Sequence, residues 1–216
     1  MTATRSRTVG CRALPLFVGV AVLLATGCAS TSNTRAQQRA LVAPEWKVGD
    51  EWAYRWEEPT GGGTYVASVV RKETLDGVEH FVVKSGVERE TYHRASDLAT
   101  SMEKVSGGID TRLVPPRTNY QWPLAVGKTW ELTFRQERPM ARETSDLVWV
   151  WHVEKEETVS VPAGTFNTLK IVCRDKRTNK PIYEAWHSPD VKQFVRVREY
   201  LQPGTREREL IAFKLR

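Results

Sequence analysis

The sequence predicts an all-β fold, an antiparallel barrel-like or half-barrel sheet with at most one short helix. Apolar and polar residues alternate through most of the chain after residue 44, as they do in half-buried strands. Asp76-Gly77 lies between two such runs and is a strong hairpin signal. No stretch shows a long 3.6-residue period. With 216 residues and 40% hydrophobic content, the chain is large enough to bury one core.

The first predicted strand covers 50–56 and places Trp52, Tyr54 and Trp56 on one face. Gly61-Gly62-Gly63 is expected to form a turn after it. The further strands are expected at 64–72, 78–85, 88–94, 109–114, 128–136, 147–155, 157–161, 165–173, 181–187, 193–201 and 207–215.

Proline and glycine mark the expected interruptions. Pro115-Pro116 and Pro203-Gly204 are predicted breaks, because proline lacks the backbone donor of a strand ladder. Only residues 95–104 suit a helical turn or two. The Val161–Phe166 stretch is predicted to be a hairpin turn, in which Pro162 ends one strand and Gly164 supplies the turn.

The chain shows signs of two similar halves. Val48-Gly49, which leads to Trp52, is echoed by Val126-Gly127, which leads to Trp130. Tyr92-His93 is likewise echoed by Trp186-His187. We therefore expect pseudo-repeats at about 44–114 and 120–216 inside a single β domain of residues 44–216.

The N-terminus has the pattern of an export signal. Three arginines and no acidic residue precede an apolar run over 13–26, which is too short to cross a membrane as a mature helix. Leu24-Ala25-Thr26-Gly27-Cys28 resembles the lipobox of bacterial lipoproteins. That resemblance implies a signal peptide over 1–27, cleavage before Cys28, and lipidation of Cys28 with fatty acyl chains such as palmitate. Two or more such chains anchor a protein stably to a membrane.

Residues 28–43 are expected to be the lipidated cysteine and a flexible tether, because those after Cys28 are mostly small and polar. Ala29, rather than an aspartate, follows the cysteine. In diderm bacteria this pattern implies the outer membrane, with the domain facing the periplasm of the cell envelope. An alternative is a plain signal peptide with an incidental cysteine.

Charge argues against a nucleic-acid partner. The formal charge is +6, but without the three arginines of the signal the chain has 29 basic and 26 acidic residues. The basic residues alternate with glutamates instead of forming a basic stripe.

No cofactor, metal site or catalytic residue is predicted. None of the four histidines has a second histidine or cysteine at zinc-ligand spacing. Cys173, between apolar neighbours, is expected to be a small buried hydrophobe. The acidic residues Glu154, Glu156 and Glu157 are expected at a solvated hairpin rim, and the serines lack a nucleophile elbow. We therefore expect no enzyme; a hydrolase would need Asp, His and Ser side chains that converge in a cleft.

The aromatic content suggests a binding surface. Trp149 and Trp151 alternate with Val148 and Val150, so this strand is apolar on both faces. The simpler interpretation is a central strand of a sandwich or barrel. The sharper one is an apolar groove lined by Trp149, Trp151, Trp130 and Phe134.

Four stretches in one order carry a resemblance: Val126-Gly127-Lys128-Thr129-Trp130, Val161–Phe166, Trp186-His187-Ser188-Pro189 and Val195-Arg196-Val197. They resemble an uncharacterised family of bacterial envelope lipoproteins with a domain of unknown function, in which VGxxW precedes VPAGTF. The resemblance covers about 44–216 and implies an all-β barrel-like domain. A looser likeness to lipoprotein-carrier folds implies a curved sheet around an apolar cavity.

Two functions follow as hypotheses. The first is a membrane-anchored, non-catalytic binding or carrier module for an apolar or lipid-linked ligand or an extended peptide. The second is a structural or assembly partner in a cell-envelope protein complex, which would pair through exposed edge strands.

Overall fold

The computed structural model describes residues 40–216, which form a closed antiparallel barrel. The predicted all-β, barrel-like fold is confirmed. A single 3-10 turn, η1 (Pro189–Val191), is the only helical element in this part of the chain. The twelve strands are β1 (Glu51–Glu58), β2 (Gly61–Leu75), β3 (Val78–Ser85), β4 (Arg89–Arg94), β5 (Thr100–Val105), β6 (Gly108–Arg117), β7 (Thr129–Arg138), β8 (Glu143–Val161), β9 (Gly164–Asp175), β10 (Pro181–Ser188), β11 (Gln193–Tyr200) and β12 (Thr205–Lys214).

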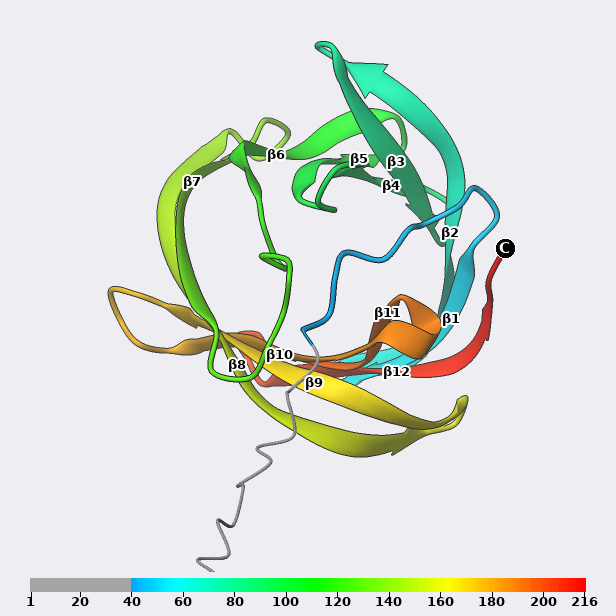
Figure 1. Ribbon diagram of the computed structural model, residues 1–216. Helices are drawn as coiled ribbons and strands as arrows, with labels where there is room; N and C mark the ends of the chain where they lie inside the picture. The colour runs from blue at the N-terminus through cyan, green and yellow to red at the C-terminus, as the bar shows by residue number, and fades with distance from the viewer. Residues whose placement is uncertain (1–39) are drawn as a thin grey trace, which may run out of the picture. The chain divides into compact units, whose positions relative to one another are not determined.

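Each strand pairs with its neighbours in sequence, and β1 pairs with β12 to close the ring (Figure 1). In the closing pair, Trp52 lies opposite Phe213 and Trp56 opposite Arg208. A closed ring leaves the first and last strands without a free edge.

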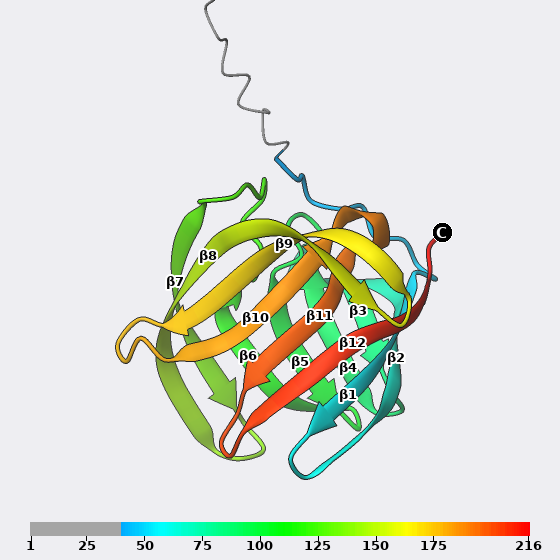
Figure 2. The same cartoon turned by 90° about the horizontal axis from the view of Figure 1, so that it is seen from below.

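The two ends of the barrel differ (Figure 2). At one end the strands are joined by short turns, such as those after β1, β3, β5 and β11; we call this the hairpin end. At the other end lie the incoming chain, residues 118–128 and η1; we call this the plugged end. The segment over residues 40–50 crosses the ring interior in Figure 1.

The segments at the plugged end, which we call the plug, are held together by aromatic residues and one carboxylate. The ring centres of Trp46 and Trp52 lie 5.4 Å apart. The indole nitrogen of Trp46 donates to the Lys192 carbonyl, and that of Trp52 donates to the Val191 carbonyl. Asp50 is fully buried and accepts hydrogen bonds from Lys47 N, Lys192 Nζ and Arg216 N. This carboxylate therefore ties the incoming chain, the β10–β11 connection and the C-terminus to one point.

The tip of the long β8–β9 hairpin folds over β11 and β12 (Figure 2). Ala163 N donates to Leu210 O, and Arg196 donates to Ser160 O. Phe166 meets Phe213 edge to face. The predicted turn at Val161–Phe166 therefore also packs on β12, the strand that closes the barrel.

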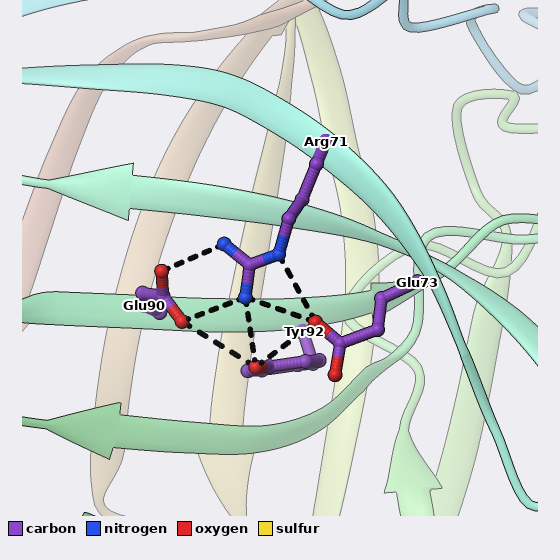
Figure 3. A network of polar contacts seen from close by, with 4 residues as sticks. All are labelled: Arg71, Glu73, Glu90 and Tyr92. Atoms are coloured by element: carbon purple, nitrogen blue, oxygen red, sulfur yellow. Dashed lines mark hydrogen bonds and ion pairs between the residues drawn. The ribbon is translucent and has the colours of Figure 1, made fainter. Parts of the chain in front are cut away.

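The outer wall carries ion pairs. On β2–β4, Arg71 donates to Glu73 and in a bidentate manner to Glu90, and it also donates to the hydroxyl of the buried Tyr92 (Figure 3). Hydrogen bonding to Arg71 lowers the pKa of Glu90. Across β1, β12 and β11, Glu209 accepts from both Arg55 and Arg196. A wall of this kind is suited to water, since charges on a lipid-facing barrel wall are destabilising.

The interior divides into two sides. On the packed side, β6–β10 enclose an apolar cluster that includes Trp130, Phe134 and Trp151. On the hollow side, β1–β5, β11 and β12 surround an open lumen above the plug. Residues 40–216 contain no helix with the length and apolar character needed to cross a membrane.

Four local predictions are wrong. Residues 95–104 form no helix; they turn and enter β5, because Asp97 caps the turn by binding Arg94 and Ala99 N. Gly61–Gly63 belong to β2, and the turn is at Pro59-Thr60. The strand β6 continues through Pro115-Pro116 to Arg117. The strands predicted at 147–155 and 157–161 are one strand, β8, with a register shift between Val153 and Lys155.

Candidate functional site: the barrel lumen

The hollow side holds a cavity of about 620 Å³. It extends from Trp56 and Arg206, near the hairpin end, down to Trp46 and Arg117 at the plug. Because buried side chains such as Trp46 and Trp52 fill the plugged end, the mouth of the cavity lies at the hairpin end. The site is therefore a blind pocket inside the barrel.

Stacked aromatic rings form one wall. Tyr54 stacks on Tyr65 at 5.4 Å and on Phe194 at 4.8 Å, both at an interplanar angle of 29°. The Tyr54 hydroxyl donates to Phe194 O, and burial raises its pKa well above the usual value. This wall presents flat apolar rings whose polar atoms are already engaged.

Arginines near the mouth are paired with carboxylates. Arg89 contacts Glu103 and lies 3.6 Å from Asp110. Arg206 donates to Glu58 at 2.7 Å and lies over the Trp56 ring. The positive charge at the mouth is largely neutralised within the protein.

Arg208 lies deeper, against the aromatic wall. It donates to Glu199 at 2.9 Å and to the Tyr65 hydroxyl at 3.2 Å, and its guanidinium carbon lies 5.1 Å from the Phe194 ring centre. Burial opposes its charge, but Glu199 and Tyr65 keep its pKa above the usual arginine value. Its Nε is buried and has no hydrogen-bond partner. Leaving a buried donor without a partner costs free energy.

The floor is polar and contains Arg117, Asn119, Tyr120, His93 and Thr100. Arg117 Nε donates to Asn119 Oδ1 at 3.0 Å, and its guanidinium lies over the Trp149 ring. The ring nitrogen Nδ1 of His93 lies 3.3 Å from Leu98 O. Burial, aided by the charge of Arg117 and opposed by that hydrogen bond, lowers the pKa of His93 to about 4. His93 is therefore neutral at pH 7.

The four predicted groove residues come together, but away from this cavity. Trp130 and Trp151 stack at 5.8 Å with an angle of 2°, and Trp149 meets Phe134 edge to face at 5.1 Å. Trp151 Nε1 donates to Tyr183 at 2.6 Å. These rings pack against one another inside the packed side, and the cavity is lined by other residues. A ligand at these four rings stays a prediction.

The predicted structural turn lies where β8 passes into β9. Pro162 and Ala163 separate the two strands, and Gly164 begins β9 with φ +138°. L-residues with side chains rarely adopt this conformation. The lipidation site, Cys28, lies outside the described residues.

The acidic residues predicted at a solvated hairpin rim lie instead inside the continuous strand β8, where Glu154 and Glu156 are exposed. Glu154 pairs with Lys170, and Glu157 pairs with Lys155 and accepts from Trp186 Nε1. Burial raises the pKa of the Cys173 thiol, which disfavours a reactive thiolate. Among residues 40–216, no three His, Cys, Asp or Glu side chains gather as metal ligands would. What the lumen offers is recognition by aromatic faces and guanidinium groups.

Sequence reasoning missed the lumen residues, although β12 carried a signal. Alternation puts Arg206 and Arg208 on the face of the buried Leu210, so two arginines point inward. The same period on β4 groups Arg89, Thr91 and His93. Inward-pointing charges on strands of this kind indicate a polar lumen.

Comparison with known proteins gives a distant likeness. No family model matches the chain, and no curated protein matches it. A solved structure of a provisionally named lipoprotein from Parabacteroides distasonis ATCC 8503 has 15% identity and a TM-score of 0.41, and it aligns with 82% of this chain and 100% of its own. An exported protein with a YmcC-like fold from Bacteroides fragilis NCTC 9343, also provisionally named, has 15% identity and a TM-score of 0.46, with the same coverage. The hypothetical lipoprotein YmcC from Escherichia coli (K12) has 10% identity and a TM-score of 0.40, and it aligns with 75% of this chain and 83% of its own. Because these TM-scores are low, the fold is assigned from the strand pairing of this chain alone.

Proposed function

We propose that this protein is a membrane-anchored, non-catalytic binding or carrier module whose barrel lumen holds one small apolar or lipid-linked ligand. The observation that carries the proposal is the blind cavity of about 620 Å³ with its aromatic wall. Its volume lies in the range of small-molecule sites, about 300–1,000 Å³. The aromatic wall supplies apolar contact area, and the arginines can fix a polar group.

The anchor is part of the proposal and comes from the sequence. Lipidation at Cys28 would attach the chain to the cell envelope, with the outer membrane and its periplasmic face as the expected location. The first described residues enter at the plugged end, where Leu41 pairs with Leu124. The mouth is at the opposite end of the barrel from these first described residues.

Assembly in an envelope complex stays a prediction. Each of the twelve described strands pairs with two neighbours, so whole edge strands are not offered to a partner.

A matched pair of variants tests the lumen. Ser85 lines the cavity near the mouth, whereas its neighbour Lys84 is exposed on the outer wall. Ser85→Trp is expected to fill the lumen and to lower the affinity for the anionic dye 8-anilinonaphthalene-1-sulfonate at least tenfold. Lys84→Trp adds the same side chain outside and is expected to leave it unchanged. Saturable 1:1 binding, followed by dye fluorescence and calorimetry, supports the proposal.

Two results would overturn it. One is the absence of saturable binding of the dye, decanoate and decan-1-ol to the folded wild-type protein. The other is binding that survives Ser85→Trp in full. For the anchor, mass spectrometry of the membrane-extracted protein should find acyl chains on Cys28, and Cys28→Ala should release the protein from the membrane fraction.

A further inference from the structure

We infer that the lumen takes an amphiphile with one anionic group, such as a carboxylate or a phosphate ester, and that this group lies at the floor against Arg117. This inference rests on the proposed function and adds the class of ligand and its orientation. The apolar body would lie along the aromatic wall of Tyr54, Tyr65 and Phe194, toward the mouth.

The pairing of the four lumen arginines supports the floor as the anion site. Arg89, Arg206 and Arg208 each contact at least one carboxylate within 4 Å. Arg117 has no such ion pair within residues 40–216, and the one hydrogen bond described for it is from Nε to Asn119. Its terminal nitrogens are thus left to the cavity, in the fork geometry that suits carboxylates and phosphates.

The surroundings of Arg117 carry no competing negative charge from the cavity wall. The two carboxylates that line the cavity are Glu103 and Glu199, and both lie on the mouth halves of β5 and β11. The floor instead offers neutral hydrogen-bonding groups from Asn119, Thr100 and Tyr120. A cation in a partly enclosed space is costly without a counter-charge, and a ligand anion would supply it.

The Trp149 ring holds the guanidinium in place. Its centre lies 5.4 Å from the Arg117 guanidinium carbon, and Trp149 in turn packs on Phe134 and Trp151. The packed side therefore backs Arg117 and orients it toward the hollow side. Prior placement of this kind lowers the entropy that a ligand must lose on binding.

The test compares four probes of known chemistry on the folded chain: decanoate, decyl phosphate, decan-1-ol and inorganic phosphate. Calorimetry with the wild-type protein should show decanoate and decyl phosphate at least tenfold tighter than decan-1-ol, as one charge-assisted pair allows. Inorganic phosphate should bind far more weakly than decyl phosphate, since it cannot use the aromatic wall. Equal affinity for the two phosphates would overturn the amphiphile and indicate a free-anion site.

Arg117→Gln should remove the preference for the anions, with about a tenfold loss for decanoate and no change for decan-1-ol. Arg117→Lys should retain part of the preference, because it keeps the charge and loses the fork. Arg112→Gln is the matched control, since Arg112 is exposed on the same strand and pairs with Glu137. It should bind all probes as the wild type does.

Three further outcomes contradict the inference in distinguishable ways. If decan-1-ol binds the wild type as tightly as decanoate, the ligand need not be anionic and only the proposed function survives. If Arg89→Gln or Arg206→Gln abolishes the preference and Arg117→Gln does not, the anion lies at the mouth. If no probe binds the folded protein, the proposed function fails as well.

Discussion

The packed and hollow sides of the barrel are built from the same alternating strands, yet one is filled and the other is open. On the packed side, Trp130 and Trp151 stack and Trp149 closes on Phe134. On the hollow side, aromatic rings stack along the wall and leave about 620 Å³ in front of them. Inward-facing aromatic residues are therefore not enough to fill a barrel.

The difference lies in the residues between the rings. The packed cluster is almost wholly apolar, so its side chains can close on one another. The hollow side interleaves its rings with arginines and glutamates such as Arg208 and Glu199. Removing charged groups from water without full pairing costs much free energy, so this side stays open to water or to a ligand. The hollow side is stabilised instead by the plug and by outer-wall networks such as that of Arg71 (Figure 3).

The largest expected effect is on the packed side. Trp151 has no exposed surface, stacks on Trp130 and donates to Tyr183. Trp151→Ala should lower the free energy of unfolding by about 4 kcal/mol, from lost burial and the cavity left behind. Urea unfolding followed by circular dichroism measures this. A decrease in the free energy of unfolding of less than about 1 kcal/mol would show that the packed side is not tightly packed.

Asp50 tests whether the hollow side is held at its floor. Asp50→Ala removes the acceptor for Lys192 Nζ, Lys47 N and Arg216 N. Leaving these donors without a partner should cost about 3 kcal/mol. The same unfolding experiment measures it, with Asp146→Ala, an exposed partner of Arg135, as the control. Equal losses of stability from Asp50→Ala and Asp146→Ala would show that the plug does not stabilise the hollow side.

His187 lies between the two sides, edge-on to Tyr120 and Trp122, and its pH dependence can be predicted. Burial lowers its pKa to about 4, from a usual value near 6.5. The unfolded chain takes up a proton at higher pH than the folded one, so this contribution to stability is full above pH 6.5 and is lost as the pH falls toward 4. Between pH 7 and pH 4.5 it should cost about 2 kcal/mol.

His187→Phe should flatten this part of the pH dependence, and it also removes a buried Nδ1 that has no partner. His152→Phe, at an exposed position, is the control and should keep the wild-type profile. Unfolding curves at several pH values between 4.5 and 7 decide it. An unchanged slope in His187→Phe would assign the acid sensitivity to other groups.

The smallest loss of stability is expected on the hollow wall. Phe194 is only partly buried and faces the cavity, so Phe194→Ala should cost about 1 kcal/mol, well below Trp151→Ala. Decan-1-ol binding should nevertheless weaken at least tenfold, because the ring is part of the wall. If Phe194→Ala destabilises the protein as much as Trp151→Ala, the contrast between the two sides is lost.

Local alternation was enough to predict most of the strands and the barrel-like sheet, because the inward and outward periods are encoded residue by residue. It missed β5 and divided β8 in two. It also placed Trp149 and Trp151 on one face. Alternation could not tell whether those rings meet partners across the barrel or face open space, since that depends on the closure of twelve strands. The tether, the lipidation of Cys28, the pseudo-repeats and the domain limits stay predictions.

The lumen was harder to predict for a related reason. Arg117 follows two prolines that suggested a break, yet β6 continues to it and carries it to the floor. Arg206 and Arg208 alternate with glutamates in a pattern that also fits a solvated face. The structure shows which face is the inner one, because Arg206 and Arg208 line the cavity and share their face with the buried Leu210.

Closure of the ring by β1 and β12 also has a kinetic consequence. Asp50 and Arg216, which meet across this seam, are 166 residues apart in the chain. Pairing of such distant segments carries a large loop-closure entropy and is slow compared with hairpin formation. The eleven sequential hairpins can form as the chain becomes available, but the barrel cannot close until its last strand is free to pair. A ligand-competent lumen therefore arises in one late step of folding, and truncation at the C-terminus should leave an open sheet with two free edges.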